Sequence, residues 1–155
     1  NNIIKLLKKK GIKGKIVGGY YPYNNELDCI QILEKLEKKN YIISLPKIKK
    51  NYQMDFVKWS SKEPLVINKF GIPEPSNGKI KFPDILLVPL LSFDTKLNRV
   101  GYGGGFYDRY IHRIKRKKKP LLVGLAYSFQ KVKSIPVNRY DKKLDFVVTE
   151  RKIIE

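Results

Sequence analysis

The sequence predicts an α/β protein built in three layers, with a mainly parallel sheet and helices on both of its faces. Short apolar runs typical of strands alternate along the chain with stretches of helical periodicity, a pattern that produces parallel sheets. Two of these runs, at 84–91 and 121–127, are almost continuously apolar, as expected of central strands covered on both faces. The length of 155 residues and the hydrophobic content of 42% suffice for a single packed domain spanning 1–155.

The first half of the chain is expected to form two helices and three strands. In chain order, the helix, strand, helix, strand and strand cover 1–10, 15–21, 28–40, 41–45 and 53–59. Gly11 follows the apolar stripe of the first helix and suits its C-terminal cap. Pro22 ends the first strand, and the strongly punctuated segment 70–75 (FGIPEP) is expected to be a loop.

The second half is expected to continue the alternation. After the central run at 84–91 come a turn, a glycine-rich segment, a basic helix and two strands, at 94–98, 99–106, 107–119, 121–127 and 144–148. We find no internal repeat and no linker that would divide the chain. The two halves are therefore expected to form a single domain.

The charge of the chain is strongly positive. Lys and Arg number 33 against 14 Asp and Glu, a formal net charge of +19, which is typical of proteins that bind nucleic acid or another polyanion. Most of the excess is lysine, and the chain is also rich in Ile, Asn and Tyr, whose codons are AT-rich as well. Base composition can therefore account for the charge, which we treat as weak support for nucleic acid and better support for small anionic ligands.

The cysteine content and hydropathy bear on location. Cys29 is the single cysteine, so no internal disulfide can form, and a reducing, cytoplasmic setting fits. No apolar run approaches the roughly 20 residues that span a bilayer. We therefore expect a cytoplasmic protein that does not associate with membranes.

The segment RVGYGGGFYDRY, at 99–110, is the strongest candidate for a ligand site. Glycines let backbone N–H groups converge on an anion at a helix N-terminus, Arg99 and Arg109 suit phosphate, and Asp108 suits a hard cation. The segment is neither a dinucleotide fingerprint, because Phe106 stands where a glycine is needed, nor a Walker A loop. Without a ligand, the glycines would form a tight helix–sheet turn and Asp108 would be a carboxylate favoured by the helix dipole.

This segment and several others resemble the 5-formyltetrahydrofolate cyclo-ligase family, also called methenyltetrahydrofolate synthetases. The landmarks, in order, are YYPYNNELD, LPKI, MDFVKW, GIPEP, DILLVPLLSFDTKLNRVGYGGGFYDRY and the near-match IPVNRYDKKLDFVVTE. The resemblance covers nearly the whole chain from about Lys15. It implies a three-layer Rossmann-like fold of the type also found in NagB, RpiA and the CoA transferases.

The resemblance also implies an ATP- and Mg²⁺-dependent ligase of one-carbon folate metabolism. Such an enzyme converts 5-formyltetrahydrofolate to 5,10-methenyltetrahydrofolate and releases ADP and phosphate. The formyl oxygen attacks the γ-phosphate, N10 attacks the resulting iminium phosphate, and phosphate leaves. We therefore expect a cytoplasmic monomer whose partners are ATP and a reduced folate, with or without a polyglutamate tail, rather than nucleic acid.

Residue by residue, the resemblance implies the following site. The catalytic residues are Arg99, Tyr107 and Asp108, and the Mg²⁺ ligands are Asp108 and Asp141. The ATP-binding residues are Arg99, Val100, Gly101, Tyr102, Gly103, Gly104, Gly105, Phe106 and Tyr107. The residues that bind the folate are Tyr21, Glu26, Met54, Phe56, Phe70, Tyr102, Gly103, Gly104, Gly105 and Phe106.

The chain departs from the family pattern in two places. Some members carry a lysine where Gly104 stands, so phosphate contacts here would depend more on the backbone. Members also carry a further N-terminal helix before the segment matched by 1–10, with basic residues that help bind ATP, and this sequence is expected to lack it. A catalytically weakened folate- or nucleotide-binding relative is therefore an alternative to an active enzyme.

A nucleic-acid-binding module is the alternative from a different functional class. The mixture of aromatic and basic residues around Tyr102 is also found in RNA-binding modules, although no RNA-binding signature is present. Single residues also have plain structural interpretations. Glu26 could be a carboxylate at a helix N-terminus, and Asp141 could cap a turn. Met54, Phe56, Phe70 and Trp59 could be core residues instead of a wall for flat ligand rings.

Overall fold

The computed structural model describes residues 2–12 and 14–155. Its helices are α1 (Asn2–Lys9), α2 (Ile30–Glu37) and α3 (Phe106–Ile114), with short 3₁₀ turns η1 (Lys50–Tyr52) and η2 (Ser128–Gln130). The main sheet has eight strands, in the spatial order β12 (Ile153–Ile154), β11 (Phe146–Val148), β10 (Leu121–Leu125), β7 (Ile85–Val88), β1 (Ile16–Gly18), β2 (Ile42–Ile48), β3 (Met54–Lys58) and β6 (Ile80–Lys81). Two small ribbons pair β4 (Leu65–Ile67) with β5 (Pro73–Pro75) and β8 (Ser92–Phe93) with β9 (Arg99–Val100).

The centre of the main sheet is parallel, as the sequence predicts. Strands β11, β10, β7, β1 and β2 pair in parallel with one another, in that order. Strands β12, β3 and β6 add antiparallel pairs at the two ends of the sheet. A mainly parallel sheet with antiparallel edges is a common form of the α/β fold.

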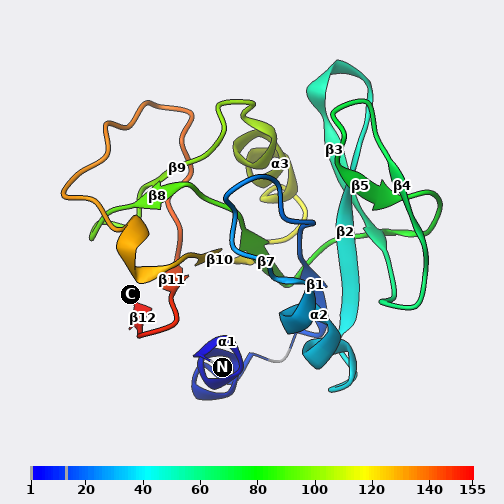
Figure 1. Ribbon diagram of the computed structural model, residues 1–155, viewed down its shortest axis with the longest axis horizontal. Coiled ribbons are helices and arrows are strands. Elements are labelled where there is room, and N and C mark those ends of the chain that lie inside the picture. Colours follow the sequence, from blue (N-terminus) through cyan, green and yellow to red (C-terminus); the bar gives the residue numbers. More distant parts are fainter. Residues whose placement is uncertain (1, 13) are drawn as a thin grey trace.

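Strand β7 shows how the three layers arise from the sequence. All four of its residues are buried, and side chains alternate between the two faces of a strand. Ile85 and Leu87 pack in the core that includes α1 and α2, whereas Leu86 and Val88 pack in the core that includes α3. Figure 1 shows α1 and α2 on one side of the sheet and α3 on the other, which confirms helices on both faces.

The helices bury the stripes that the sequence predicts. In α1 the buried residues are Ile3, Leu6 and Leu7, and Gly11, with a φ of 57°, lies just past the end of the helix. Helix α3 stops at Ile114 instead of reaching 119, because the basic residues that follow offer no apolar side chain to bury. Within residues 2–12 and 14–155, no helix has the length and apolar character needed to cross a membrane.

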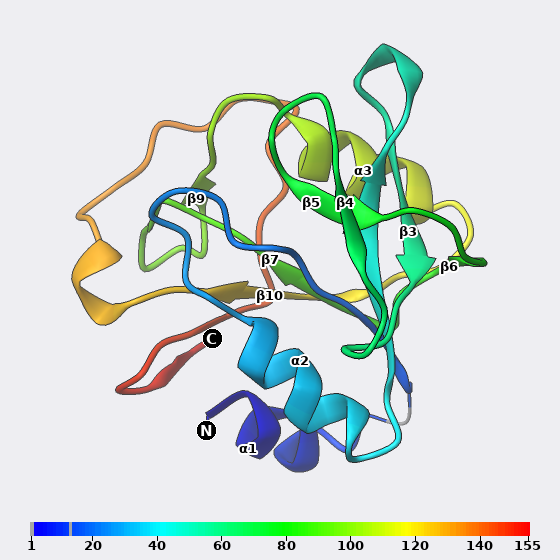
Figure 2. The same cartoon turned by 45° about the vertical axis from the view of Figure 1, so that its right-hand side comes forward.

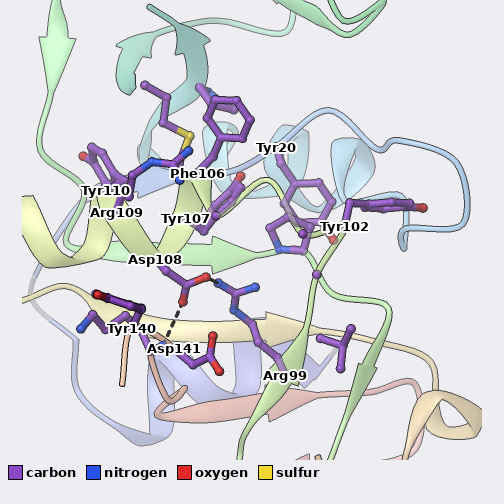
Figure 3. A pocket seen from close by; sticks show the side chains of 18 of the residues that line it. Tyr20, Arg99, Tyr102, Phe106, Tyr107, Asp108, Arg109, Tyr110, Tyr140 and Asp141 are labelled. Atoms are coloured by element: carbon purple, nitrogen blue, oxygen red, sulfur yellow. Dashed lines mark hydrogen bonds and ion pairs between the residues drawn. The ribbon is translucent and has the colours of Figure 1, made fainter. Parts of the chain in front are cut away.

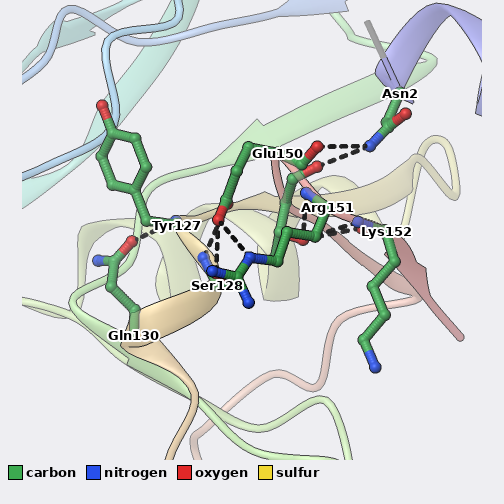
Figure 4. A network of polar contacts seen from close by, with 8 residues as sticks. Asn2, Tyr127, Ser128, Gln130, Glu150, Arg151 and Lys152 are labelled. Atoms are coloured by element: carbon green, nitrogen blue, oxygen red, sulfur yellow. Dashed lines mark hydrogen bonds and ion pairs between the residues drawn. The ribbon is translucent and has the colours of Figure 1, made fainter.

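Polar contacts tie the first helix to the C-terminal strands (Figure 4). The side-chain amide of Asn2 donates to the carbonyl oxygen of Thr149 at 2.9 Å. Glu150, in the same turn between β11 and β12, accepts hydrogen bonds from the backbone N–H and the hydroxyl of Ser128 in η2. The turn thus holds α1 and η2 together beside the edge of the sheet.

The segment at 70–75 differs from the expectation of a loop. It contains β5, which pairs antiparallel with β4 and lies against the β2–β3 hairpin in Figure 2. Prolines lack a backbone donor and so indicate a loop, but they are tolerated in the edge strand of a small ribbon. Glu74, between the two prolines and only 7% exposed, accepts hydrogen bonds from the backbone of Ile48 and the side chain of Asn68.

Candidate active site

A cleft of about 1300 Å³ lies beyond the carboxyl ends of two parallel strands. Tyr20 and Tyr21, which follow β1, line it together with Pro89, which follows β7. Ligands of open parallel sheets bind outside the carboxyl ends of the strands. The remaining walls come from the loop before α2, the β2–β3 hairpin, the turn between β4 and β5, the glycine segment with α3, and the stretch 135–142.

The glycine segment lies between β9 and α3 and turns along the cleft. Gly103 and Gly105 have φ values of 87° and 65°, which a residue with a Cβ rarely adopts. Gly105 is also the N-cap of α3, so the unpaired N–H groups and the positive end of the helix dipole are at the cleft. The segment therefore combines the geometry of a tight turn with the donors of an anion site.

Arg99 and Asp108 form an ion pair at the start of this segment (Figure 3). Arg99 Nη2 lies 3.0 Å from Asp108 Oδ2, and the Arg99 side chain is only 8% exposed. The second carboxylate oxygen of Asp108 accepts the backbone N–H of Lys142 at 2.9 Å. Arg99 Nε is buried and has no hydrogen-bond partner among the described residues, so the ion pair with Asp108 leaves part of this guanidinium group unsatisfied.

Asp108 and Asp141 line the same cleft. Asp141 caps a turn, because its Oδ2 accepts the backbone N–H of Asn138 at 2.8 Å, and its side chain is exposed to the cleft as well. The described residues contain no group of three or more His, Cys, Asp or Glu side chains placed to hold a metal. Two carboxylates fit Mg²⁺, which commonly takes one or two carboxylates and completes its shell with water and substrate phosphates.

Asp94 fixes the wall that carries Asp141. It lies in the turn between β8 and β9 and is 1% exposed. Its carboxylate accepts the backbone N–H groups of Lys96, Asn98 and Ile135 at 2.9, 3.0 and 3.1 Å, and the side chain of Asn98 at 3.0 Å. Burial alone would raise the pKa of Asp94, but these hydrogen bonds hold it below its ordinary value. The carboxylate of Asp94 thus joins the turn before β9, the strand that begins with Arg99, to the stretch 135–142.

Glu26 lies on the opposite wall, in the loop before α2. Helix α2 begins at Ile30, so Glu26 is not a carboxylate of the helix N-terminus. Burial raises its pKa to about 7, although the backbone N–H of Tyr23, which donates to it at 2.9 Å, acts in the opposite direction. A half-buried carboxyl group that titrates near neutrality is a candidate for contact with a polar ligand.

Aromatic rings form a further wall. The ring centroid of Phe106 lies 5.8 Å from that of Phe70 and 6.0 Å from that of Tyr52, and Met54 also lines the cleft. Phe56 differs from the expectation of substrate contact: it is fully buried, is absent from the lining, and packs with its centroid 4.8 Å from that of Tyr110. Phe56 therefore supports the wall from behind.

Two tyrosines of α3 present buried hydroxyls at this wall. The hydroxyl oxygens of Tyr107 and Tyr110 are buried and have no hydrogen-bond partner among the described residues. Burial raises the pKa of both phenols, so both are protonated near neutral pH. Unpartnered buried hydroxyls are rare, and here they can donate to a polar atom that enters the cleft.

Most of the expected site residues line this one cleft. They are Tyr21, Glu26, Met54, Phe70, Arg99, Val100, Gly101, Tyr102, Gly103, Gly105, Phe106, Tyr107, Asp108 and Asp141. Gly104 is not among the lining residues, and its carbonyl oxygen accepts a hydrogen bond from Arg109. Trp59 lies elsewhere, with its indole N–H donating to the carbonyl of Glu63. His112, an exposed residue of α3, reaches the rim.

Sequence reasoning missed several lining residues. Arg139, Tyr140 and Lys142 surround Asp141 in the sequence and line the cleft with it. Their stretch has no regular structure in the part of the chain that the structure describes, so no periodic pattern marked it. The charged residues Arg139 and Lys142, which flank Asp141 in the sequence, could have indicated that this stretch lines the site.

Comparison with known proteins places this geometry in a family. The model of the "5-formyltetrahydrofolate cyclo-ligase family" matches residues 5–150. A 5-formyltetrahydrofolate cyclo-ligase from Haemophilus influenzae is 34% identical over 140 residues, which are 85% of this chain and 74% of that protein. The enzyme of the same name from Escherichia coli K12 is 32% identical over 147 residues, 90% of this chain and 80% of that protein.

Solved structures agree with the sequence comparison. The NMR structure of 5,10-methenyltetrahydrofolate synthetase from Aquifex aeolicus has a TM-score of 0.77 and 32% identity, covering 97% of this chain and 77% of that one. The 5,10-methenyltetrahydrofolate synthetase from Mycoplasma pneumoniae has a TM-score of 0.70 and 25% identity, covering 94% and 78%. The α/β architecture of this chain is therefore shared with two solved 5,10-methenyltetrahydrofolate synthetases.

Proposed function

The chain belongs to the 5-formyltetrahydrofolate cyclo-ligase family, and from that premise we propose how its cleft carries out the reaction. The reaction converts 5-formyltetrahydrofolate to 5,10-methenyltetrahydrofolate with consumption of ATP. One observation carries the assignment of the site. A single cleft joins the glycine segment and the Arg99–Asp108 pair to an aromatic wall and the half-buried Glu26.

The chemistry proceeds in two steps. The formyl oxygen attacks the γ-phosphorus of ATP, so that a new O–P bond forms and the bond from phosphorus to the oxygen of ADP breaks. The lone pair of N10 then attacks the activated formyl carbon, the N10 proton is released, and the C–O bond breaks as phosphate leaves. Phosphorylation is needed because the oxygen of a formamide is a poor leaving group. The work of the protein is positioning and charge neutralisation.

The phosphates are assigned to the glycine segment and Arg99. Support comes from the two left-handed glycines, which open the backbone toward the cleft, and from the N-terminus of α3 directly behind them. Arg99 is held by Asp108 and has donors that no described residue satisfies, so its guanidinium group is ordered before a phosphate binds. Val100, Gly101, Tyr102, Phe106 and Tyr107 complete the proposed nucleotide site.

Mg²⁺ is assigned to Asp108 and Asp141. Both carboxylates line the cleft beside Arg99, and each oxygen of a carboxylate has two lone pairs, so the hydrogen bonds of Asp108 leave capacity for an ion. When bound, the ion would neutralise charge on the phosphate oxygens. Asp108 thus has two proposed tasks, to orient Arg99 and to share the ion with Asp141.

The folate is assigned to the opposite wall. Met54, Phe70 and Phe106 offer flat or flexible apolar surface for the ring systems, and Glu26 with Tyr21 offers polar contacts at the end of the cleft beside β1. We further propose that residues 1–155 act as one domain, as a monomer in the cytoplasm. Size-exclusion chromatography with light scattering tests the monomer directly.

The activity is tested by incubating the protein with 5-formyltetrahydrofolate, ATP and Mg²⁺ and following the absorbance of the methenyl product. Product formation that requires both ATP and Mg²⁺, with ADP released in equal amount, is the expected result. ATP binding without turnover would identify a catalytically weakened relative instead. Failure to bind either ligand would contradict the assignment of the cleft.

A further inference from the structure

Arg109 turns its side chain back onto the glycine segment. It is the fourth residue of α3, and its Nη2 donates to the carbonyl oxygen of Gly104 at 2.7 Å. Its Nη1 lies only 2.7 Å from the position that a Cβ on Gly105 would occupy. The guanidinium group therefore lies against the turn itself, at the upper part of the cleft in Figure 3.

Further contacts hold this guanidinium group in place. The same Nη2 donates to the carbonyl oxygen of Tyr52 in η1 at 2.9 Å, and the Cζ atom lies 5.2 Å from the ring centroid of Phe106. Two carbonyls and one aromatic face thus fix the head group before any ligand arrives. An ordered donor loses less conformational entropy on binding than a mobile one.

The charge of Arg109 is unmatched in its surroundings. Arg99 pairs with Asp108 and Arg113 pairs with Asp55, whereas Arg109 is in none of the ion pairs found in the described part of the chain. A guanidinium group has five N–H donors, and Nη2 uses its two on the carbonyls. The three donors of Nη1 and Nε are without a hydrogen-bond partner among the described residues, and Arg109 lines the cleft.

The glycine segment itself has no cationic side chain. From Val100 to Asp108 the sequence contains no Lys or Arg, so the turn offers N–H groups and a helix dipole but no full positive charge. A polyphosphate bound there would carry several negative charges, and bidentate arginine contacts are among the strongest hydrogen bonds to phosphate.

We propose that Arg109 is the side-chain cation of the glycine segment and binds a phosphate group of the nucleoside triphosphate. This assignment rests on the proposed function and adds a binding residue to it. Arg99 would contact phosphate at the start of the glycine segment, next to Gly101. Arg109 would do so at its end, next to Gly104 and Gly105.

The competing role for Arg109 is structural. Through Gly104 and Tyr52 it also clamps the glycine segment to η1, so its removal could simply loosen the cleft. The decisive variants are Arg109→Gln, which removes the charge, and Arg109→Lys, which keeps the charge on a side chain that ends one bond short of the Nη2 that reaches both carbonyls. ATP dissociation constants are measured by calorimetry without folate, and KM values are measured for ATP and for 5-formyltetrahydrofolate.

A phosphate role predicts that Arg109→Gln weakens ATP binding about tenfold or more while KM for the folate changes less than about twofold, and that Arg109→Lys retains most of the ATP affinity. A clamp predicts the opposite: Arg109→Lys fails as badly as Arg109→Gln, both KM values rise together, and the melting temperature falls. That second pattern would overturn the proposal.

A charge transplant adds an independent test. Gly104 has no positive φ, and a Cβ there would lie 3.0 Å from two ring atoms of Phe106, a ring that can shift slightly toward the cleft. Gly104→Lys in the Arg109→Gln background is expected to recover roughly threefold or more of the lost ATP affinity. A lysine at 104 replaces the charge but not the clamp.

Arg116→Gln is the matched control. Arg116 follows the end of α3 and does not line the cleft, and its replacement removes the same net charge, so it is expected to leave ATP binding unchanged. If Arg116→Gln weakened ATP as much as Arg109→Gln, the effect would be general electrostatics and the proposal would fail. Because ATP binding is measured without folate, this result is independent of whether the wild-type protein shows turnover.

Discussion

The hydroxyl of Tyr102 lies 3.2 Å from the carbonyl oxygen of Tyr23 and donates a hydrogen bond to it across the cleft. The same hydroxyl accepts the backbone N–H of Asn25 at 3.2 Å, and the two tyrosine rings meet edge to face with centroids 5.3 Å apart. The glycine segment and the loop that carries Glu26 are therefore joined by one phenol. Through it, a nucleotide bound against the first segment can influence the position of the second.

Removal of this hydroxyl is expected to uncouple the two substrates. Tyr102→Phe keeps the ring but loses two hydrogen bonds worth about 1 kcal/mol each, so KM for the folate should rise by about three- to tenfold. In the wild-type protein, a non-hydrolysable ATP analogue should tighten folate binding, and in the variant this effect should shrink. Tyr41→Phe, outside the cleft, is the control. Equal coupling in both variants would argue against the link.

The proposed metal ligands are best separated through Asp141. Asp141→Asn should raise the Mg²⁺ concentration for half-maximal rate by about tenfold and leave the melting temperature nearly unchanged, because the side chain is exposed and an amide oxygen can still cap the turn. Asp28→Asn, another turn-capping carboxylate, should leave the Mg²⁺ requirement unchanged. A normal Mg²⁺ titration of Asp141→Asn would remove this residue from the metal site.

Asp108→Asn also tests the proposed metal site, but it disturbs the ion pair with Arg99 at the same time. It would leave the nearly buried guanidinium of Arg99 without its charge partner, and loss of one member of a buried pair costs about 3 kcal/mol or more of folding free energy. Turnover should be lost together with several degrees of melting temperature, as measured by calorimetry. An unchanged melting temperature would show that the pair contributes little to stability.

The raised pKa of Glu26 makes stability depend on pH. The folded state holds the proton up to about pH 7 and the unfolded chain only to about pH 4.5, so folding is favoured below pH 4.5 and this contribution is lost as pH rises through 7. Glu26→Gln should therefore melt at a higher temperature than the wild-type protein at about pH 8 and at a similar temperature at about pH 4. Glu34→Gln, on α2, should follow the wild-type curve. Parallel curves for Glu26→Gln and the wild-type protein would refute the assignment.

The single thiol reports on global unfolding. Cys29 is fully buried, its Sγ lies 3.0 Å from the carbonyl oxygen of Tyr20, and burial raises its pKa to about 12. A thiolate is needed for reaction with disulfide reagents, so labelling at about pH 8 should be slow and should follow the unfolding rate measured in denaturant. Rapid labelling of the native protein would show local opening of the loop before α2.

The sequence was most informative where one physical effect dominates. The run at 84–91 is apolar because both faces of β7 are covered, and the glycine segment could be placed between a strand and a helix because positive φ values require glycine. By contrast, β5 was hidden by its prolines, which suit an isolated ribbon as well as a loop. Local composition cannot show which of the two forms.

Side-chain roles were harder to predict than elements. The raised pKa of Glu26 comes from burial by distant segments, and Phe56 lies behind the wall because its strand faces α3, neither of which a single sequence reveals. Arg109 was visible as a basic residue beside the glycines, but its return onto the turn depends on the carbonyl of Tyr52, which lies 57 residues away in the sequence.

The hydrogen bonds of Asp94 imply that the two rims of the cleft differ in stiffness. Through its hydrogen bond to Ile135, this buried carboxylate holds β9, which carries Arg99, and the stretch before Asp141 together. The side of the cleft that is proposed to bind the phosphates is therefore preformed. The rim with Glu26 meets the glycine segment through Tyr102, whose hydroxyl bonds the backbone of Tyr23 and Asn25 and whose ring packs on that of Tyr23. We therefore expect the rim with Glu26 to adjust when the folate binds, whereas the nucleotide meets a preformed frame.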